Sequence, residues 1–262
     1  MSHIINTNQK EQRLNEESLN NQGCLMKIVV YNFNNDITIE FQDKYRARIH
    51  STYKNFKNGK VKNPYYPSVH GVGIIGNKYP HSINGQTLKE YDAWSQFIAR
   101  CHSNQYKNTI YKDVCCCDEW LLYENFYEWL HSQKNFDKWL NCERWAVDKD
   151  ILIKGNKVYS PETCCLVPQI INNLFTKKNI KKDDLPIGVD KHNNRYRARC
   201  NNVYLNKAEI IGYYDTPEEA FLAYKEYKKS YIKQVAQKEY SKGNITKQCY
   251  EAMMNYEVEI TD

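Results

Sequence analysis

Apolar and polar residues alternate along three consecutive stretches near the N-terminus. These stretches cover residues 26–33, 36–43 and 44–50. Because successive side chains of a strand point to opposite faces, a period of two predicts three short strands, and Asn and Asp residues between them supply the turns. In the third strand the alternation places Arg46 and Arg48 on one face. The pattern predicts a small β-module over residues 25–84.

The apolar period becomes helical in the middle of the chain. Aromatic residues recur every three or four positions within residues 87–104 and 118–130, and residues 135–141 continue the pattern. Aromatic stripes at this spacing are typical of a buried helix face. We therefore expect these helices to form a scaffold around the segment that follows.

That segment runs from Trp145 to Phe175. It predicts a short strand that carries Asp148, Lys149 and Asp150, a turn at Gly155-Asn156 and a returning strand. A brief helix entered at Pro168 then carries Asn172 and Asn173. An acid on a hairpin and an amide on the next helix can hold one metal ion against a phosphate. A purely structural hairpin shares this geometry.

The C-terminal part predicts three short strands and one long helix. Thr216, Pro217 and the two glutamates after them are typical of a helix start. The expected fold class is α+β, with several domains. The expected segments are a disordered leader (1–24), the β-module (25–84), a helical scaffold with a ββα-metal-like hairpin (85–176), a basic linker (177–186), a three-stranded sheet packed on one helix (187–240) and a tail (241–262).

Composition narrows the function classes only slightly. The 262 residues carry a net charge of +6, from 37 basic and 31 acidic side chains, so the placement of charge matters more than its amount. No apolar run reaches the length of a membrane span and no signal-peptide pattern opens the chain, so we expect an intracellular protein without a membrane partner.

The ten cysteines include two adjacent runs, residues 115–117 and 164–165. Structural zinc sites use Cys pairs separated by two to four residues, so reduced thiols are the favoured interpretation. A zinc site built from Cys101, His102 and the 115–117 run is the alternative.

Two basic clusters suggest binding to a phosphate-bearing partner. In the first, Arg46 and Arg48 are followed by three lysines, which predicts either a solvated rim or a phosphate-contacting surface. In the second, a period of two places Arg195, Arg197 and Arg199 on one face of a strand. Arginine forks contact phosphates and the acceptor edge of guanine. The alternative for this strand is salt bridging to acids such as Glu209 or Asp190.

Residues 186–236 resemble the ethylene-response-factor (APETALA-type) DNA-binding domain. The resemblance lies in the IGV opening, the YRA strand and the IGYYDTPEEAFLAY passage from sheet to helix. It implies a three-stranded sheet that enters the major groove of double-stranded DNA. Its implied contacts are Arg195, Arg197 and Arg199, with Tyr204 and Lys207 on the next strand.

Residues 87–176 resemble the HNH (ββα-metal) endonucleases of phages and mobile elements. The resemblance lies in YDAWSQFIARC, CCCDEWLLYENFYEWL and VDKDI…KGNKVYSPETCCLVPQIINNLF. It implies a Mg²⁺ or Mn²⁺ ion held by Asp148 and Asn172, with Asn173 as the alternative ligand.

The position of the family's catalytic histidine is occupied by Lys149, which is a poor base at its ordinary pKa near 10.4. Lys149 could bind phosphate while Asp150 or His131 takes the proton. The asparagine that braces the hairpin loop in that family falls near Thr163.

Three functions follow as hypotheses. The first is a sequence-directed, metal-dependent DNA endonuclease of homing type, encoded by a phage or mobile element. The second is a catalytically inactive DNA-binding regulator built on the same fold. The third is an interaction protein that inhibits a host nuclease or defence system.

Overall fold

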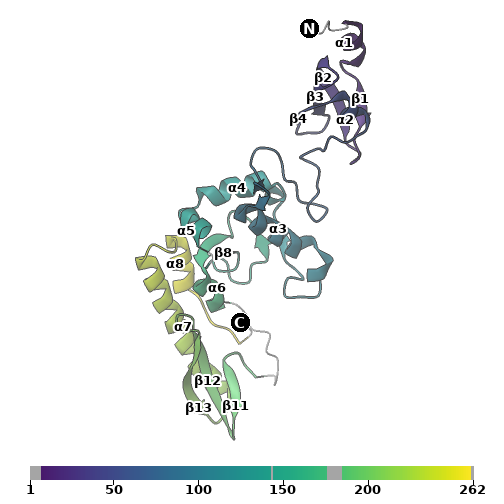
Figure 1. Cartoon of the computed structure of the whole chain (residues 1–262). Coiled ribbons are helices and arrows are strands. Elements are labelled where there is room, and N and C mark those ends of the chain that lie inside the picture. The colour runs from purple at the N-terminus through teal and green to yellow at the C-terminus, as the bar shows by residue number, and fades with distance from the viewer. Residues whose placement is uncertain (1–6, 143, 176–184, 261–262) are drawn as a thin grey trace. The chain divides into compact units, whose positions relative to one another are not determined.

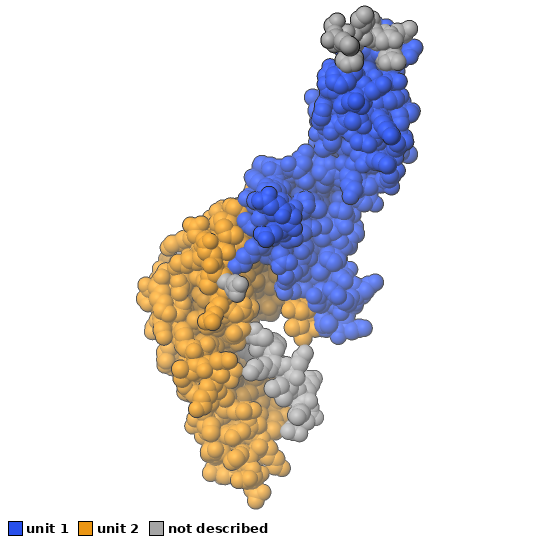
Figure 2. Space-filling model, in the orientation of Figure 1, with its two compact units in different colours: residues 1–109, 118–127 blue, residues 110–117, 128–262 orange. Residues whose placement is uncertain are grey.

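The computed structural model describes residues 7–142, 144–175 and 185–260. Most of the expected basic linker, 177–186, lies outside these ranges. Helices and several separate sheets are both present, which confirms the α+β class. The chain divides into two compact units (Figure 2). Unit 1 contains residues 1–109 and 118–127, and unit 2 contains residues 110–117 and 128–262.

Unit 1 begins with a four-stranded antiparallel sheet (Figure 1). Its strands are β1 (Glu17–Leu19), β2 (Leu25–Phe33), β3 (Asp36–Phe41) and β4 (Arg48–Ser51), in that order across the sheet. Short helices α1 (Thr7–Arg13) and α2 (Tyr53–Lys57) flank them. Ile28, Ile39 and Phe56 are fully buried between the sheet and α2. The period of two therefore produces the β-module that it predicts.

The expectation of a disordered leader over residues 1–24 is wrong for its described part. Strand β1 pairs with β2, with Glu17 opposite Lys27. The buried side chain of Asn20 then donates to the Val61 carbonyl at 2.9 Å and accepts from the Cys24 amide at 2.8 Å. The leader is ordered because the sheet uses its backbone as an edge strand, which needs little apolar side-chain area.

Two helices with an aromatic core follow; the first, and the part of the second that precedes residue 128, belong to unit 1. They are α3 (Lys89–His102) and α4 (Tyr123–Ser132), with the hairpin β5 (Ser82–Ile83) and β6 (Gln86–Thr87) and the 3₁₀ turns η1 (Asn104–Tyr106) and η2 (Asp118–Leu121). Trp94 and Trp120 are fully buried, and the Trp94 indole donates to the Trp120 carbonyl at 2.7 Å. Phe97 lies 5.7 Å from the Trp120 ring, centroid to centroid. The aromatic stripes are core faces, as their helical spacing predicts.

Unit 2 contains two further assemblies. The first includes β7 (Cys115–Cys116), α5 (Phe136–Asn141), β8 (Trp145–Asp148), β9 (Val158–Tyr159), β10 (Cys165–Pro168) and α6 (Gln169–Phe175). The second includes the antiparallel sheet β11 (Val189–His192), β12 (Arg195–Asn202) and β13 (Lys207–Tyr214), followed by α7 (Pro217–Ser241) and α8 (Lys247–Met254). Helix α7 starts with the predicted cap, because Thr216 and Glu219 form a reciprocal capping box.

The two assemblies of unit 2 share one hydrophobic core. Ala198 of the sheet packs in the same buried cluster as Ala220 and Tyr224 of α7. Val167 and Ile171 of the first assembly belong to that cluster too. One continuous core therefore joins segments that the sequence assigns to separate domains. No described helix of either unit is long and apolar enough to cross a membrane.

Candidate nucleic-acid interface

Strands β8 and β10 and helix α6 form a ββα unit. The strands are antiparallel, with Trp145 opposite Pro168 and Asp148 opposite Cys165. Helix α6 starts at the residue after Pro168. The predicted turn at Gly155-Asn156 does not join the paired strands. The segment after it forms β9, which pairs in parallel with β7 instead.

Asp148 causes the chain to leave the hairpin. Its carboxylate Oδ1 accepts from the backbone amides of Asp150 at 2.8 Å and Ile151 at 3.0 Å, so the chain turns directly after β8. The long segment between the strands is therefore a loop closed on itself rather than a tight hairpin.

Asn156 braces this loop. Its side-chain amide donates to the carbonyls of Lys149 and Val158, both at 2.8 Å, and its oxygen accepts from the Val158 amide. The bracing role expected near Thr163 belongs to Asn156, because an amide can donate to two carbonyls at once. Thr163 adds a single donor bond to the Val158 carbonyl at 2.7 Å. The predicted turn at Gly155-Asn156 is the sequence signal that could have located this bracing residue.

The three residues expected to carry catalysis lie together at the end of β8. Burial raises the pKa of Asp148, against the opposing effect of its two backbone hydrogen bonds. The Lys149 ammonium is buried and lies 2.5 Å from Asp150 Oδ1 and 3.2 Å from the Asn156 carbonyl. Asp150 is half exposed. In this arrangement Lys149 is a fixed cation donor, and Asp150 is the carboxylate that solvent reaches.

The expected metal ligands make a sparse donor set. Asn172 is half-buried on α6, and the exposed Asn173 accepts from Gln169 at 3.0 Å. Within the described ranges, no three His, Cys, Asp or Glu side chains gather into a group that could hold a metal. This finding gives no support to the alternative zinc site at Cys101, His102 and 115–117. His131, the other candidate proton acceptor, packs on Phe136 with ring centroids 3.9 Å apart.

The sheet of unit 2 has one covered and one exposed face. Ala198 and Cys200 of β12 are buried beneath α7. The opposite side, which we name the outer face, carries Arg195, Arg197 and Arg199 of β12 together with Ile210 and Tyr213 of β13. A bulge between Ala198 and Arg199 shifts the pairing with β13 and leaves the alternation along β12 intact.

Each outer-face arginine contacts an acid, which is the alternative raised for this strand. The Nε atoms of Arg197 and Arg199 lie 2.9 Å and 2.5 Å from the two oxygens of Asp190. Nε of Arg195 lies 3.0 Å from Asp215, and its Nη2 donates to the Tyr213 carbonyl.

The other expected acid, Glu209, lies on the covered side, where it accepts from Asn202 and Tyr227. The three arginines are therefore held in place and still 23–53% exposed.

Of the two weaker candidates, only Lys207 lies on the strand predicted for them. It is exposed at the start of β13. Tyr204 lies in the turn between β12 and β13, and its hydroxyl donates to the buried Glu239 of α7 at 2.9 Å. The Lys238 ammonium covers its ring at 3.8 Å. Tyr204 therefore faces α7 and is absent from the outer face.

The N-terminal basic cluster is also paired. Arg46 lies in a turn with φ 54°, because the Asp43 carboxylate accepts from the amides of Tyr45 and Arg46. The third strand thus begins at Arg48 rather than at residue 44. Glu40 lies 2.6 Å from Arg46 and 2.8 Å from Arg48. Glu40 engages both arginines, which weakens the interpretation of this cluster as a phosphate-contacting surface.

Two outer-face residues escaped the sequence analysis. Tyr213 is 39% exposed and Ile210 is 55% exposed. The ring of His192 on β11 lies 5.3 Å from that of Tyr213. Their signal was the period of two in β13, which places residues 210 and 213 on one face only when the bulge is known.

No family model, curated protein or solved structure matches the chain.

Proposed function

We propose that the chain is a DNA-binding protein whose outer face docks on double-stranded DNA. The observation that carries this proposal is the presentation of three arginines on the exposed side of a sheet that α7 covers from behind. The resemblance of residues 186–236 to the APETALA-type domain supports the same docking face.

The pairing of these arginines with acids is compatible with binding. All three acid contacts use Nε. A guanidinium has five N–H donors, so the Nη edges of Arg197 and Arg199 are outside these pairs. Asp190 and Asp215 fix the inner edge of the forks and thereby orient the outer edge, which is the edge that contacts a phosphate or a guanine. Tyr213 and Ile210 add apolar area between the forks.

The test replaces Arg195, Arg197 and Arg199 with Ala and measures duplex affinity by fluorescence anisotropy over a range of salt concentrations. We expect weaker binding and a salt dependence shallower by about 2–3 in log–log slope, because about one phosphate contact is lost per arginine. The control replaces Lys225, Lys233 and Lys247 of α7 and α8, which removes the same charge away from the outer face.

Equal losses in the two triple variants would mean that net charge alone attracts DNA. Unchanged affinity in the arginine variant would refute the proposed docking face. If the chain binds a protein such as a host nuclease, and this binding survives excess competitor DNA, a protein partner would be favoured instead.

Phosphodiester cleavage is the second candidate function, and the ββα unit favours it. Asp148 ends β8, α6 follows β10 directly, and Asn156 braces the loop between the strands. Asp148 and Asn172 would hold Mg²⁺ or Mn²⁺, which usually binds one or two carboxylates together with substrate phosphates. When bound, the ion would stabilise the leaving oxygen. Lys149 would hold the phosphate.

Nicking of supercoiled plasmid in the presence of Mg²⁺ or Mn²⁺ tests this candidate. Asp148→Asn should abolish nicking and preserve binding, because the amide oxygen still accepts from the amides of Asp150 and Ile151. If neither metal produces nicks that depend on Asp148, the chain is a DNA-binding regulator on a nuclease-like fold.

A further inference from the structure

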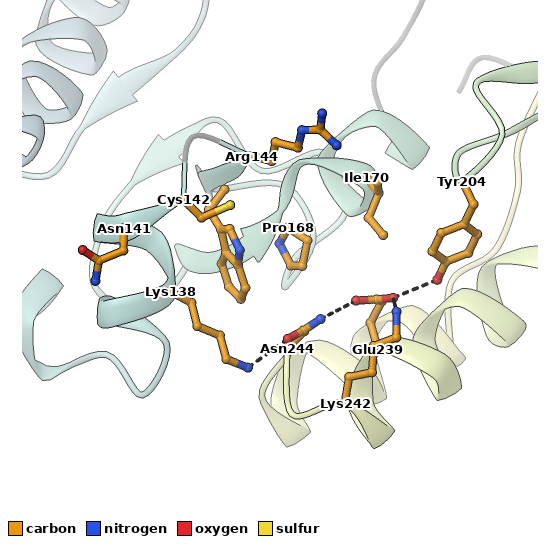
Figure 3. A pocket seen from close by; sticks show the side chains of 11 residues that line it. Lys138, Asn141, Cys142, Arg144, Pro168, Ile170, Tyr204, Glu239, Lys242 and Asn244 are labelled. Carbon is orange, nitrogen blue, oxygen red and sulfur yellow. Dashed lines mark hydrogen bonds and ion pairs between the residues drawn. The ribbon is translucent and has the colours of Figure 1, made fainter.

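Unit 2 contains a cleft between the ββα unit and helix α7. Its volume is about 440 Å³. Pro168 and Ile170 line one side (Figure 3). Trp145, which pairs with Pro168 across β8 and β10, also lines the cleft. Tyr204 and Glu239 line the other side (Figure 3). A volume of this size is typical of sites for small organic molecules.

The floor of the cleft is a fixed hydrogen-bond network. Glu239 is 1% exposed and accepts from the Tyr204 hydroxyl, the Lys242 ammonium and the Asn244 amide at 2.9, 2.9 and 2.7 Å (Figure 3). Burial opposes ionisation of Glu239, but these three donors outweigh it and lower the pKa of the carboxyl. The carboxylate is therefore ionised at neutral pH with its charge taken up by donors of the floor.

The network also ties the two walls together. The Lys138 ammonium of α5 donates to the Gly243 carbonyl at 3.0 Å and to Asn244 Oδ1 at 2.9 Å. The Asn135 side chain donates to the Asn244 carbonyl at 3.0 Å. These hydrogen bonds fix α5 against the turn that follows α7, so the cleft is preformed within one unit.

The rim of the cleft is cationic. Lys138, Arg144 and Lys242 are all exposed at its edge, and Lys138 lies 5.9 Å from the centre of the Trp145 ring. Of these three, only Lys242 pairs with the carboxylate of the floor. The cleft therefore offers an aromatic and apolar wall beside at least two positive charges.

We propose that this cleft binds an unpaired deoxynucleotide, with the base against Trp145 and the phosphate at the cationic rim. A planar apolar group joined to a phosphate is the ligand that matches an aromatic wall with a cationic edge, and base–aromatic stacking is tolerant of sequence. The proposal extends the proposed function to a second contact in the same unit. It also gives a role to Tyr204, which helps build the wall opposite Trp145.

The experiment measures binding of fluorescein-labelled oligo(dT) of about ten nucleotides to the full-length protein. Arg144→Ala and Trp145→Phe should each weaken this binding by about tenfold, because each removes or reduces one of the two contacts. Lys138→Ala should do the same, and Lys138→Arg should retain affinity. Lys233→Ala is the matched control and should bind as the native protein does.

Further arms separate this site from the outer face. Fully paired duplex reports on the outer face, and duplex with one extra unpaired thymidine reports on the cleft as an affinity ratio. Arg144→Ala should lower this ratio and leave the affinity for paired duplex unchanged. The triple arginine variant should lower both duplex affinities and leave the ratio unchanged. The affinity ratio and the paired-duplex affinity therefore test the cleft and the outer face independently.

Free dTMP and inorganic phosphate test the chemistry of the ligand. dTMP should compete with oligo(dT) and quench the fluorescence of Trp145, a signal that Trp145→Phe removes. Competition by phosphate as strong as that by dTMP would overturn the nucleotide assignment. Native affinity for oligo(dT) in both Arg144→Ala and Trp145→Phe would overturn the site.

Discussion

The tetrapeptide Tyr-Arg-Ala-Arg occurs twice in the chain, at residues 45–48 and 196–199, with two different backbones. In the first copy it forms a turn and only its last residue enters β4. In the second copy it lies wholly within β12, the central strand of its sheet. In both copies the alanine is buried and the two arginines grip one acid on a neighbouring strand.

The flanking residues decide between the two conformations. Before the first copy, Asp43 captures the amides of Tyr45 and Arg46 and forces Arg46 to a positive φ. Before the second copy the turn comes earlier, at Asn193, whose φ is 55°. Position 195 is already in the strand when the tetrapeptide begins. The position of the preceding turn therefore decides which backbone conformation the same tetrapeptide adopts.

At their second position the two copies also differ in which guanidinium edge the acid occupies. Arg46 uses Nη2 for Glu40 and Nη1 for Gln42, so both outer nitrogens are engaged. Arg197 uses Nε for Asp190. At the fourth position both arginines, Arg48 and Arg199, use Nε. Glu40 is buried, whereas the Asp190 side chain is 25% exposed. The first copy is thus organised around a buried acid, and the second around a partly exposed one.

Valine and glycine substitutions at the second tetrapeptide position give the largest expected contrast. Arg46→Val should be less stable than Arg46→Gly by about 1–3 kcal/mol, because a β-branched residue is strained at positive φ. At position 197 the order should reverse by about 1 kcal/mol, since valine favours a strand and glycine weakens it. Urea denaturation followed by circular dichroism measures both pairs.

Each pair of variants loses the same arginine, so the comparison within a pair cancels the lost ion contact. The same order at both positions would show that the two backbones do not differ in the way described.

Neutralising the acid that pairs with the two arginines should change duplex affinity at the second copy and leave it unchanged at the first. Asp190→Asn keeps one oxygen, which can accept from one of the two arginines, while removing a negative charge from the outer face. Duplex affinity should rise several-fold and its salt dependence should steepen. Glu40→Gln should leave duplex affinity unchanged, as anisotropy titrations would reveal. A loss of affinity in Asp190→Asn would contradict the outer-face assignment.

The smallest expected effect is a pH dependence of stability at the first copy. The hydrogen bond from Arg48, with the charge of Arg46, lowers the pKa of Glu40 below its ordinary value of 4.5 despite partial burial. A lowered folded-state pKa contributes stability above the ordinary value that is lost as pH falls through the folded value. The Tm difference between the native protein and Glu40→Gln should therefore be largest near neutral pH and vanish in acid.

Thermal melts from pH 7 down to about pH 3 would record this difference, a range that spans the ordinary glutamate pKa. A Tm difference that stays constant over the range would mean that Glu40 acts through packing rather than charge.

Periodicity predicted the elements whose side chains alternate without interruption. Strands β3 and β12 and the helix start at Thr216 fall where their patterns place them. The aromatic faces of α3 and α4 are buried for the same reason, since spacing along a helix fixes which side meets the core.

The failures lie where one polar side chain redirects the backbone. Asp43 closes a turn where a strand start was predicted. Asp148 closes a turn that opens a long loop where a tight hairpin was predicted. The pairing of β8 with β10 depends on bonds across sixteen intervening residues, 149–164, which no local pattern reports. Glu40 could not be predicted as a partner, because it lies on a neighbouring strand whose register is set only on folding. Asp190 was one of the two acids predicted for the arginine strand, and the structure shows the contact.

Helix α7 has a consequence for where the two proposed contacts of unit 2 can fall on a duplex. It runs without interruption for 25 residues, a length of about 37 Å. Its first turns cover the sheet, and Glu239 near its last turn forms the floor of the cleft. A continuous helix that joins the two sites would hold the two contacts at one fixed separation on the DNA.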